Sequence, residues 1–191
     1  MTAPLRHFDG DEAAVVADTR RWLERAVIGL NLCPFAKAVH AKGRIRWVVT
    51  GASDRRELLD ELKRELRLLA EADPEAIDTT LLVHPHALAD FGDYLDFVDQ
   101  AERALRKAGL EGTLQIATFH PDYAFADAPP DDPANHTNRS PHPMLHLLRE
   151  ASLDRAVEAF PDAADIYGRN VETLRRLGHA GWRQLFADDG A

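Results

Sequence analysis

The sequence lacks several features, and each absence excludes a class of protein. Cys33 is the only cysteine among 191 residues, so the chain can form no internal disulfide and no zinc or iron–sulfur site built from several cysteines. No stretch approaches the roughly 20 apolar residues of a membrane span, and the N-terminus has no apolar core of signal-peptide length. We therefore expect no membrane partner and a cytoplasmic location.

Positive charge is also scarce. The chain has 23 lysines and arginines against 32 aspartates and glutamates, a net charge of −9, and no basic run long enough to follow a phosphate backbone. Nucleic acid is therefore not an expected partner. The hydrophobic content of 45% is sufficient for one core, so we expect residues 1–191 to form a single domain, with about ten N-terminal residues and the last few flexible.

The spacing of hydrophobic residues predicts alternating strands and helices. Short β-branched or aromatic runs predict three strands, near residues 45–50, 79–83 and 114–119. Leucine and aromatic stripes at helical spacing predict a helix after each of the first two strands, from Ser53 or Asp54 to Asp73 and from Phe91 to Leu105. This order favours an α/β fold with a small, mainly parallel three-stranded sheet and crossover helices.

Further helices are predicted on both sides of this pattern. They are a helix from Asp11 to about Leu30, a short helix opened by Pro143 that carries Met144, Leu147 and Leu148, and helices at 152–160 and 165–177, the last closed by Gly178. We expect the N-terminal and C-terminal helices to cover the sheet.

Two histidines directly follow predicted strands. His84 comes after the second strand and His120 after the third. Because the carboxyl ends of parallel strands meet at one edge of a sheet, we expect the two side chains to be close together there, in a ligand crevice. The first strand reaches the same edge at residues 50–53, whose small side chains would leave backbone N–H groups and a helix N-terminus open to an anion.

Residues 119–150 are the most informative part of the chain. They hold six of the eleven prolines and four of the nine histidines, but few ordinary core residues. A connection this long is typically functional or disordered, and Tyr123, Phe125, Met144 and Leu147 favour an ordered segment because they can anchor it. We expect this segment to roof the crevice.

One prediction for the crevice is acid–base chemistry. His120 could act as a general base with Asp122 or Asp131 orienting it, and His84 is the second catalytic candidate. The alternative is an ion pair at the surface.

Asn138, Arg139 and Ser140 are candidate ligand-binding residues. A guanidinium can hold a carboxylate or phosphate through two parallel hydrogen bonds. Arg139 could instead pin its own acidic loop through Asp131 or Asp132.

A divalent metal is a candidate cofactor, because imidazole and carboxylate ligands suit zinc, iron or manganese. The candidate ligands are His84, His86, His120, His136 and His142. The alternative is that these histidines hydrogen-bond the backbone and cap loops, since no two of them have the spacing of a helical zinc motif.

Cys33 and Lys37 form a separate candidate. If Pro34 begins a helix, Lys37 lies one turn from the thiol, and a thiolate at a helix N-terminus near a cation would have a lowered pKa. The alternative is a buried, unreactive cysteine, because free cysteine is among the most buried residue types.

Several blocks of the sequence resemble a bacterial family of unknown function, numbered 1415. They are WLERAVIGLNLCPFAKAVHAKGRIRWVV, DTTLLVHP, FHPDYAFA, DDPANHTNRSPHPMLHLLREAS and NVETLRRLGHAGW, and the similarity extends from about Thr19 to about Leu185. The family's blocks include Cys33, Pro34, Phe35, Lys37, His84, His120, Pro121, Asp122, Asn138, Arg139, Ser140 and His146. The resemblance adds weight to a site at these positions but implies no activity.

Three classes of function follow from these patterns. The first is a small cytosolic enzyme that acts on a polar or anionic small molecule in a crevice of histidine, aspartate and arginine, with or without a metal. The second is a ligand-binding or metal-binding module without chemistry. The third is a partner-binding protein that presents residues 121–143 as an ordered interface.

Overall fold

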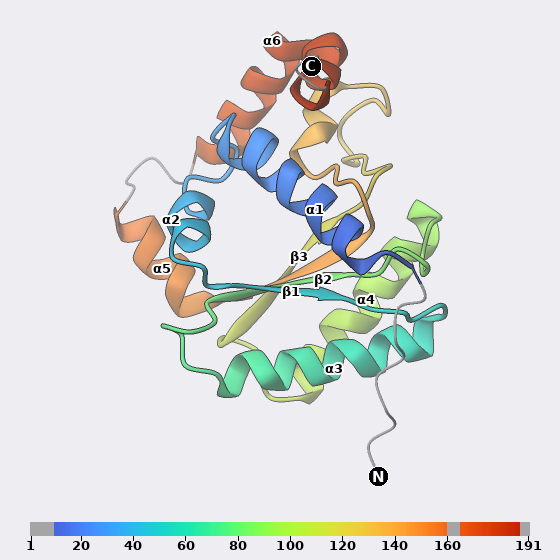
Figure 1. Ribbon diagram of the computed structural model, residues 1–191, viewed down its shortest axis with the longest axis vertical. Coiled ribbons are helices and arrows are strands. Elements are labelled where there is room, and N and C mark those ends of the chain that lie inside the picture. The colour runs from blue at the N-terminus through green and yellow to red at the C-terminus, as the bar shows by residue number, and fades with distance from the viewer. Residues whose placement is uncertain (1–9, 160–164, 188–191) are drawn as a thin grey trace.

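The structure is a computed structural model that describes residues 10–159 and 165–187, and its centre is a mixed sheet (Figure 1). The strands are β1 (Ile45–Val49), β2 (Thr79–Val83), β3 (Leu114–Phe119) and β4 (Met144–Arg149), in the order β1-β2-β4-β3. β1 and β2 are parallel, and β4 is antiparallel to both β2 and β3. β1, β2 and β3 therefore run in the same direction.

The α/β class and the first three strands are confirmed, but the sheet has four strands and is mixed. The fourth strand replaces the short helix predicted after Pro143. Met144 packs into the core on one face of the sheet, whereas Leu145 and Leu147 pack into the core on the other. A central strand is apolar on both sides, so its hydrophobic residues do not alternate with a period of two. The sequence pattern of β4 was therefore interpreted as a helix.

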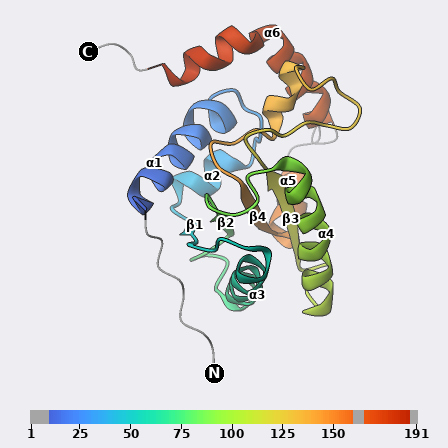
Figure 2. The ribbon, with the colours of Figure 1, turned by 90° about the vertical axis from the view of Figure 1, so that its right-hand side faces the viewer.

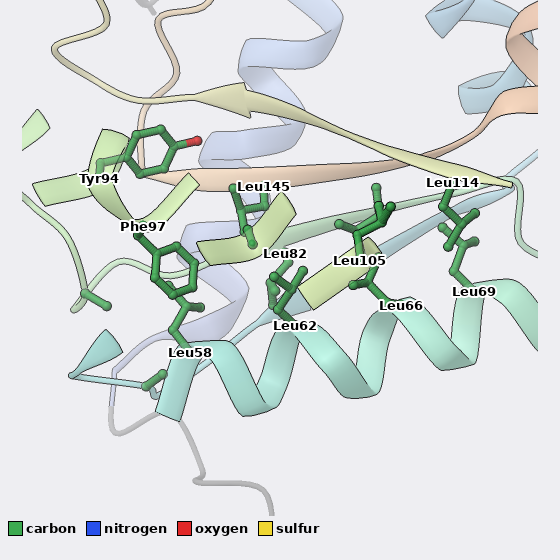
Figure 3. Close-up of a cluster of buried hydrophobic side chains, with 14 residues drawn as sticks. Leu58, Leu62, Leu66, Leu69, Leu82, Tyr94, Phe97, Leu105, Leu114 and Leu145 are labelled. Atoms are coloured by element: carbon green, nitrogen blue, oxygen red, sulfur yellow. The ribbon is translucent and has the colours of Figure 1, made fainter. Parts of the chain in front are cut away.

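Two helices cover one face of the sheet (Figure 2). α3 (Arg55–Glu71) and α4 (Phe91–Lys107) are capped by the preceding residues, Asp54 and Asp90, whose carboxylates accept hydrogen bonds from backbone N–H groups of the first turn. Their leucine and aromatic stripes meet Leu82 and Leu145 of the sheet in a closed core (Figure 3). These crossover helices confirm the sequence prediction.

The other face lies under α1 and α6. α1 (Glu12–Trp22) continues as a π-helix at Leu23–Ile28. α6 (Ile166–Phe186) packs Trp182 and Phe186 against the apolar cluster on this face, which includes Trp22 and Met144. Gly178 closes the helical stretch predicted at 165–177, at φ 65° and ψ 176°, and the second part of α6, which follows this bend as far as Phe186, was not predicted. Two shorter helices, α2 (Ala36–Ala41) and α5 (Glu150–Ala159), complete the described chain.

The segments expected to be flexible, about ten N-terminal residues and the last few, fall almost entirely outside the described residues. Within 10–159 and 165–187, no helix combines the length and the apolar character that crossing a membrane requires.

Residues 120–143 connect β3 to β4 and stay at the carboxyl edge of the parallel strands. Phe119 pairs with Met144, so the chain leaves and re-enters the sheet at the same place. The segment contains the 3₁₀-helix η2 (Pro133–Thr137), which begins at Asp132, whose carboxylate accepts a hydrogen bond from the N–H of Ala134. It contacts α6 along η2 (Figure 1).

The hydroxyl of Tyr94 joins the two ends of this connection. It donates to the carbonyl oxygen of Met144 at 2.8 Å and accepts from the N–H of Phe119 at 3.0 Å. Tyr94→Phe should leave both backbone groups without this partner and lower the free energy of unfolding by about 1–3 kcal/mol. Urea unfolding measures the change, with Tyr167→Phe, at a side chain that is 48% exposed, as the control. Equal stabilities of the two variants would contradict this role.

Candidate functional site

His84 and His120 lie together at the carboxyl ends of β2 and β3. The common direction of these two strands predicted this placement. The His84 ring stacks on Tyr94 with centroids 5.9 Å apart, and the His120 ring contacts the same tyrosine at 5.1 Å. Both histidines are 0% exposed. The expected proximity is therefore confirmed, but the pair lies inside the protein rather than in an open crevice.

His84 is a core histidine. Its Nδ1 donates to the carbonyl oxygen of Ala87 at 3.0 Å, and its Nε2 has no hydrogen-bond partner within the described residues. Burial lowers its pKa to about 4, since desolvation disfavours the imidazolium. The ring is neutral at physiological pH.

Both ring nitrogens of His120 form hydrogen bonds with the backbone. Nε2 donates to the carbonyl oxygen of Leu88 at 3.1 Å, and Nδ1 accepts from the N–H of Asp122 at 3.0 Å. The side chain of Asp122 is exposed and does not orient the imidazole through a hydrogen bond. This arrangement holds two loops together, and protonating Nδ1 would break one of its bonds. The catalytic roles of His84, His120 and Asp122 stay predictions.

Asn138, Arg139 and Ser140 pack beside the end of β3. The Asn138 amide donates to the carbonyl oxygen of Thr118 at 3.0 Å, and the Ser140 hydroxyl donates to the carbonyl oxygen of His142 at 2.7 Å. These two side chains hold the connection in place.

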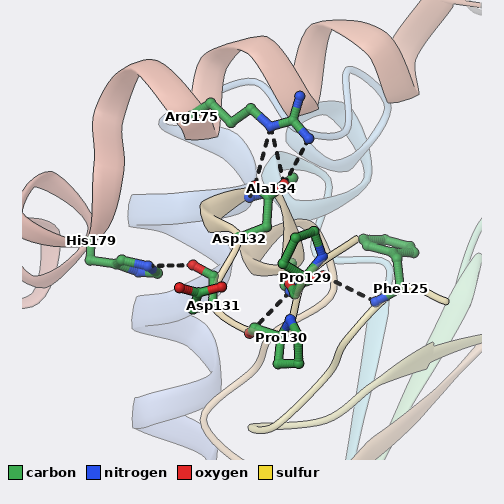
Figure 4. Close-up of polar contacts among 9 residues, drawn as sticks. Phe125, Pro129, Pro130, Asp131, Asp132, Ala134, Arg175 and His179 are labelled. Atoms are coloured by element: carbon green, nitrogen blue, oxygen red, sulfur yellow. Dashed lines mark hydrogen bonds and ion pairs between the residues drawn. The ribbon is translucent and has the colours of Figure 1, made fainter. Parts of the chain in front are cut away.

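Arg139 pins its own loop, but not through Asp131 or Asp132. Nε donates to the carbonyl oxygen of Tyr123 at 2.9 Å and Nη2 to that of Pro130 at 2.8 Å, while Nη1 has no partner within the described part of the chain. The carboxylate of Asp132 is instead held by Arg175 of α6, 2.7 Å from Nη2 (Figure 4).

The five candidate metal ligands are not gathered in one place. His84 and His120 lie in the core, His136 stacks on Trp182 with ring centroids 4.2 Å apart, and His142 lies 3.7 Å from Asp18. His86 is exposed. Within residues 10–159 and 165–187, no group of three or more histidine, cysteine, aspartate or glutamate side chains could hold a metal ion.

The other two candidates are Cys33 with Lys37 and the N-terminus of α3. Burial raises the pKa of Cys33, which opposes thiolate formation, and α2 begins at Ala36 with Lys37 exposed on its surface. The N-terminus of α3 is capped by the carboxylate of Asp54, so its N–H groups are not open to an anion as the sequence suggested.

A cavity of about 420 Å³ lies beside this edge, between α1, α6 and residues 120–143. We call it the α1–α6 cavity. α1 contributes Asp18, Arg21 and Trp22, and α6 contributes Trp182 and Phe186. The connection contributes Pro121, His136, Arg139, Ser140 and Pro141.

The cavity therefore includes only part of the predicted site. Arg139, Ser140 and the metal candidate His136 line it, whereas His84 and His120 do not. The residues that the sequence analysis missed come from the two helices, above all Trp22 and Trp182. Their signal is weak, because each tryptophan belongs to an apolar helical stripe and such stripes indicate a core.

Aromatic contacts and one hydrogen bond from a side chain to the backbone shape the walls of the cavity. The indole N–H of Trp22 donates to the carbonyl oxygen of Arg139 at 2.9 Å, which ties α1 to the connection. Trp182 stacks on His136 and meets Phe186 edge-on, with centroids 5.4 Å apart. Arg21 and Arg139 bring two positive charges to the walls, and Asp18 brings one negative charge.

The chain belongs to a family described as "Protein of unknown function (DUF1415)", whose sequence model matches residues 14–184. The resemblance seen in the sequence is therefore confirmed. No curated protein and no solved structure matches the chain. The family description names no activity.

The buried His84 should make stability depend on pH. Its pKa is about 4 in the folded protein against an ordinary value of 6.5, so between these values the unfolded chain binds more protons. The free energy of unfolding should therefore fall as the pH is lowered from 6.5 to 4 and receive no further loss from this group below that. His84→Gln should reduce the slope in this window by up to about 1.4 kcal/mol per pH unit. Equal slopes for parent and variant in urea unfolding would contradict the prediction.

Proposed function

We propose that the protein binds a small anionic molecule in the α1–α6 cavity. The observation that carries this proposal is Arg139, whose guanidinium is fixed at the wall by two carbonyl oxygens while Nη1 makes no bond within the described residues. A guanidinium held in this way loses little conformational freedom when it binds a carboxylate or phosphate.

The size and chemistry of the cavity support the proposal. Sites for small molecules typically measure about 300–1,000 Å³ and combine apolar walls with a few polar groups. The α1–α6 cavity has a volume of about 420 Å³, with tryptophan, phenylalanine and proline side chains beside Arg21, Arg139 and Ser140. An anion with an apolar or planar part would match these walls.

Ligand binding is better supported than the other predicted functions. Catalysis by His120 would require its ring to exchange a proton while both nitrogens bond to the backbone. A partner-binding role for residues 121–143 is less favoured because several of their polar groups bond to one another, as when Asn135 accepts from the N–H of Phe125 and donates to Pro129. Both functions stay alternatives, and the experiment below separates them from binding.

Arg139→Lys tests the anion contact. The lysine keeps the charge but cannot reproduce the planar donor pattern, so the affinity for an anion should fall about tenfold or more. The probes are inorganic phosphate, malate and citrate, and the binding is measured by calorimetry well below the melting temperature. Trp22 and Trp182 provide a second signal, because two of the three tryptophans line the cavity and Trp47→Phe isolates their fluorescence.

Arg149→Lys is the matched control. Arg149 also donates to backbone carbonyl oxygens, those of Ile77 and Ala72, but it does not line the α1–α6 cavity. Both variants should lose stability, and only Arg139→Lys should lose affinity. Equal affinities for the two variants, or no binding of any probe by the parent, would reject the proposed function.

A further inference from the structure

The apolar part of the wall of the α1–α6 cavity consists of ring-shaped side chains. Three of them are aromatic and two are prolines, and they are Trp22, Trp182, Phe186, Pro121 and Pro141. Among the described residues, no leucine, isoleucine, valine or methionine lines this cavity. The closed core on the α3 and α4 side of the sheet is different, because leucines form most of it. The cavity therefore presents stiff ring surfaces rather than flexible aliphatic ones.

Trp182 and Phe186 are the aromatic side chains of the wall with surface left for a ligand. Both are half-buried, whereas Trp22 is only 4% exposed and packs edge-on against Phe119. Trp182 is held from one side by the parallel ring of His136, with centroids 4.2 Å apart, and Phe186 meets it at an angle of 65°. Because these neighbours fix the indole, it loses little conformational freedom when a ligand packs against its remaining surface.

The electrostatics of the wall separate the apolar end of a ligand from its anionic end. The face of an aromatic ring carries a negative partial charge, which repels a carboxylate or phosphate but attracts another ring in an offset or edge-on arrangement. The positive groups of the wall belong to Arg21 and Arg139, and hydrogen bonds to two carbonyl oxygens fix the guanidinium of Arg139. A molecule with a ring at one end and an anionic group at the other matches both parts of the wall.

We infer that the anion bound in the α1–α6 cavity is aromatic, with a flat ring packed against Trp182 and Phe186 and a carboxylate or phosphate that reaches Arg139. The volume of about 420 Å³ has room for a benzene ring that carries one such group. This inference rests on the proposed anion binding and narrows the ligand class to arylcarboxylates and aryl phosphates.

Benzoate and cyclohexanecarboxylate are a matched pair of probes. Both carry one carboxylate, ionised at neutral pH, on a six-membered ring, but only the ring of benzoate is flat and aromatic. In calorimetric titrations the parent should prefer benzoate by about three- to tenfold, the range expected for one stacked or edge-on ring contact. Phenyl phosphate should bind more tightly than cyclohexyl phosphate for the same reason.

Leucine substitutions show whether the wall produces this preference. Trp182→Leu removes the larger ring but keeps the wall apolar, so the preference for benzoate should fall below about twofold. Phe186→Leu, at the last residue of α6, should lower the preference in part, and it decides the question if Trp182→Leu does not fold. Phe125→Leu is the matched control, because Phe125 meets Tyr123 and Tyr167 edge-on and does not line the cavity, so this variant should keep the preference of the parent.

NMR of the parent locates the bound ring. Intermolecular nuclear Overhauser effects should join the ring protons of benzoate to the indole protons of Trp182. If no anion of any kind binds to the parent, the proposed function itself fails. Three results overturn only the aromatic ligand: anions that bind without a preference for benzoate over cyclohexanecarboxylate, a folded Trp182→Leu or Phe186→Leu variant with the full preference of the parent, or Overhauser effects to aromatic side chains outside the cavity alone.

Discussion

The antiparallel pairing of β4 with both β2 and β3 determines where the rest of the chain can go. Every backbone hydrogen bond that joins β3 to the sheet is made to β4, from the Leu114–Arg149 pair to the Phe119–Met144 pair. Because β4 must begin where β3 ends, residues 120–143 are confined to one edge. This confinement, and not the direction of the parallel strands alone, places proline, histidine and arginine beside α1 and α6.

The polar composition of this connection has two explanations that sequence alone cannot separate. A loop without regular pairing must satisfy its backbone groups with side chains. Asn135 does so for Phe125, Pro129 and Pro130, and Asn138 does so for Thr118. Most of the residues that resembled a site are therefore part of the scaffold, and the atoms with unused bonding capacity are few. Nη1 of Arg139 and Nδ1 of His136 are two of them.

The sequence predicted the elements better than their arrangement. The stripes of α3 and α4 were clear because each of these helices buries only one face, and the strand-end position of His84 and His120 followed from the direction of the strands. β4 was mistaken for a helix because it is apolar on both faces. The α1–α6 cavity could not be predicted, since Trp22 and Trp182 in its walls come from helices more than 100 residues apart, and their placement around one cavity depends on how these helices cross the sheet.

The bend of α6 links the scaffold to the cavity. Gly178 has φ 65°, a conformation that costs residues with a Cβ about 1 kcal/mol or more, and it divides the helix into two parts with different partners. Before the bend, Arg175 holds the connection through Asp132. Immediately after it, His179 bonds to Asp131, and the next turn brings Trp182 onto His136. The same bend therefore lets one part of α6 hold the connection in place while the part after it closes one wall of the cavity.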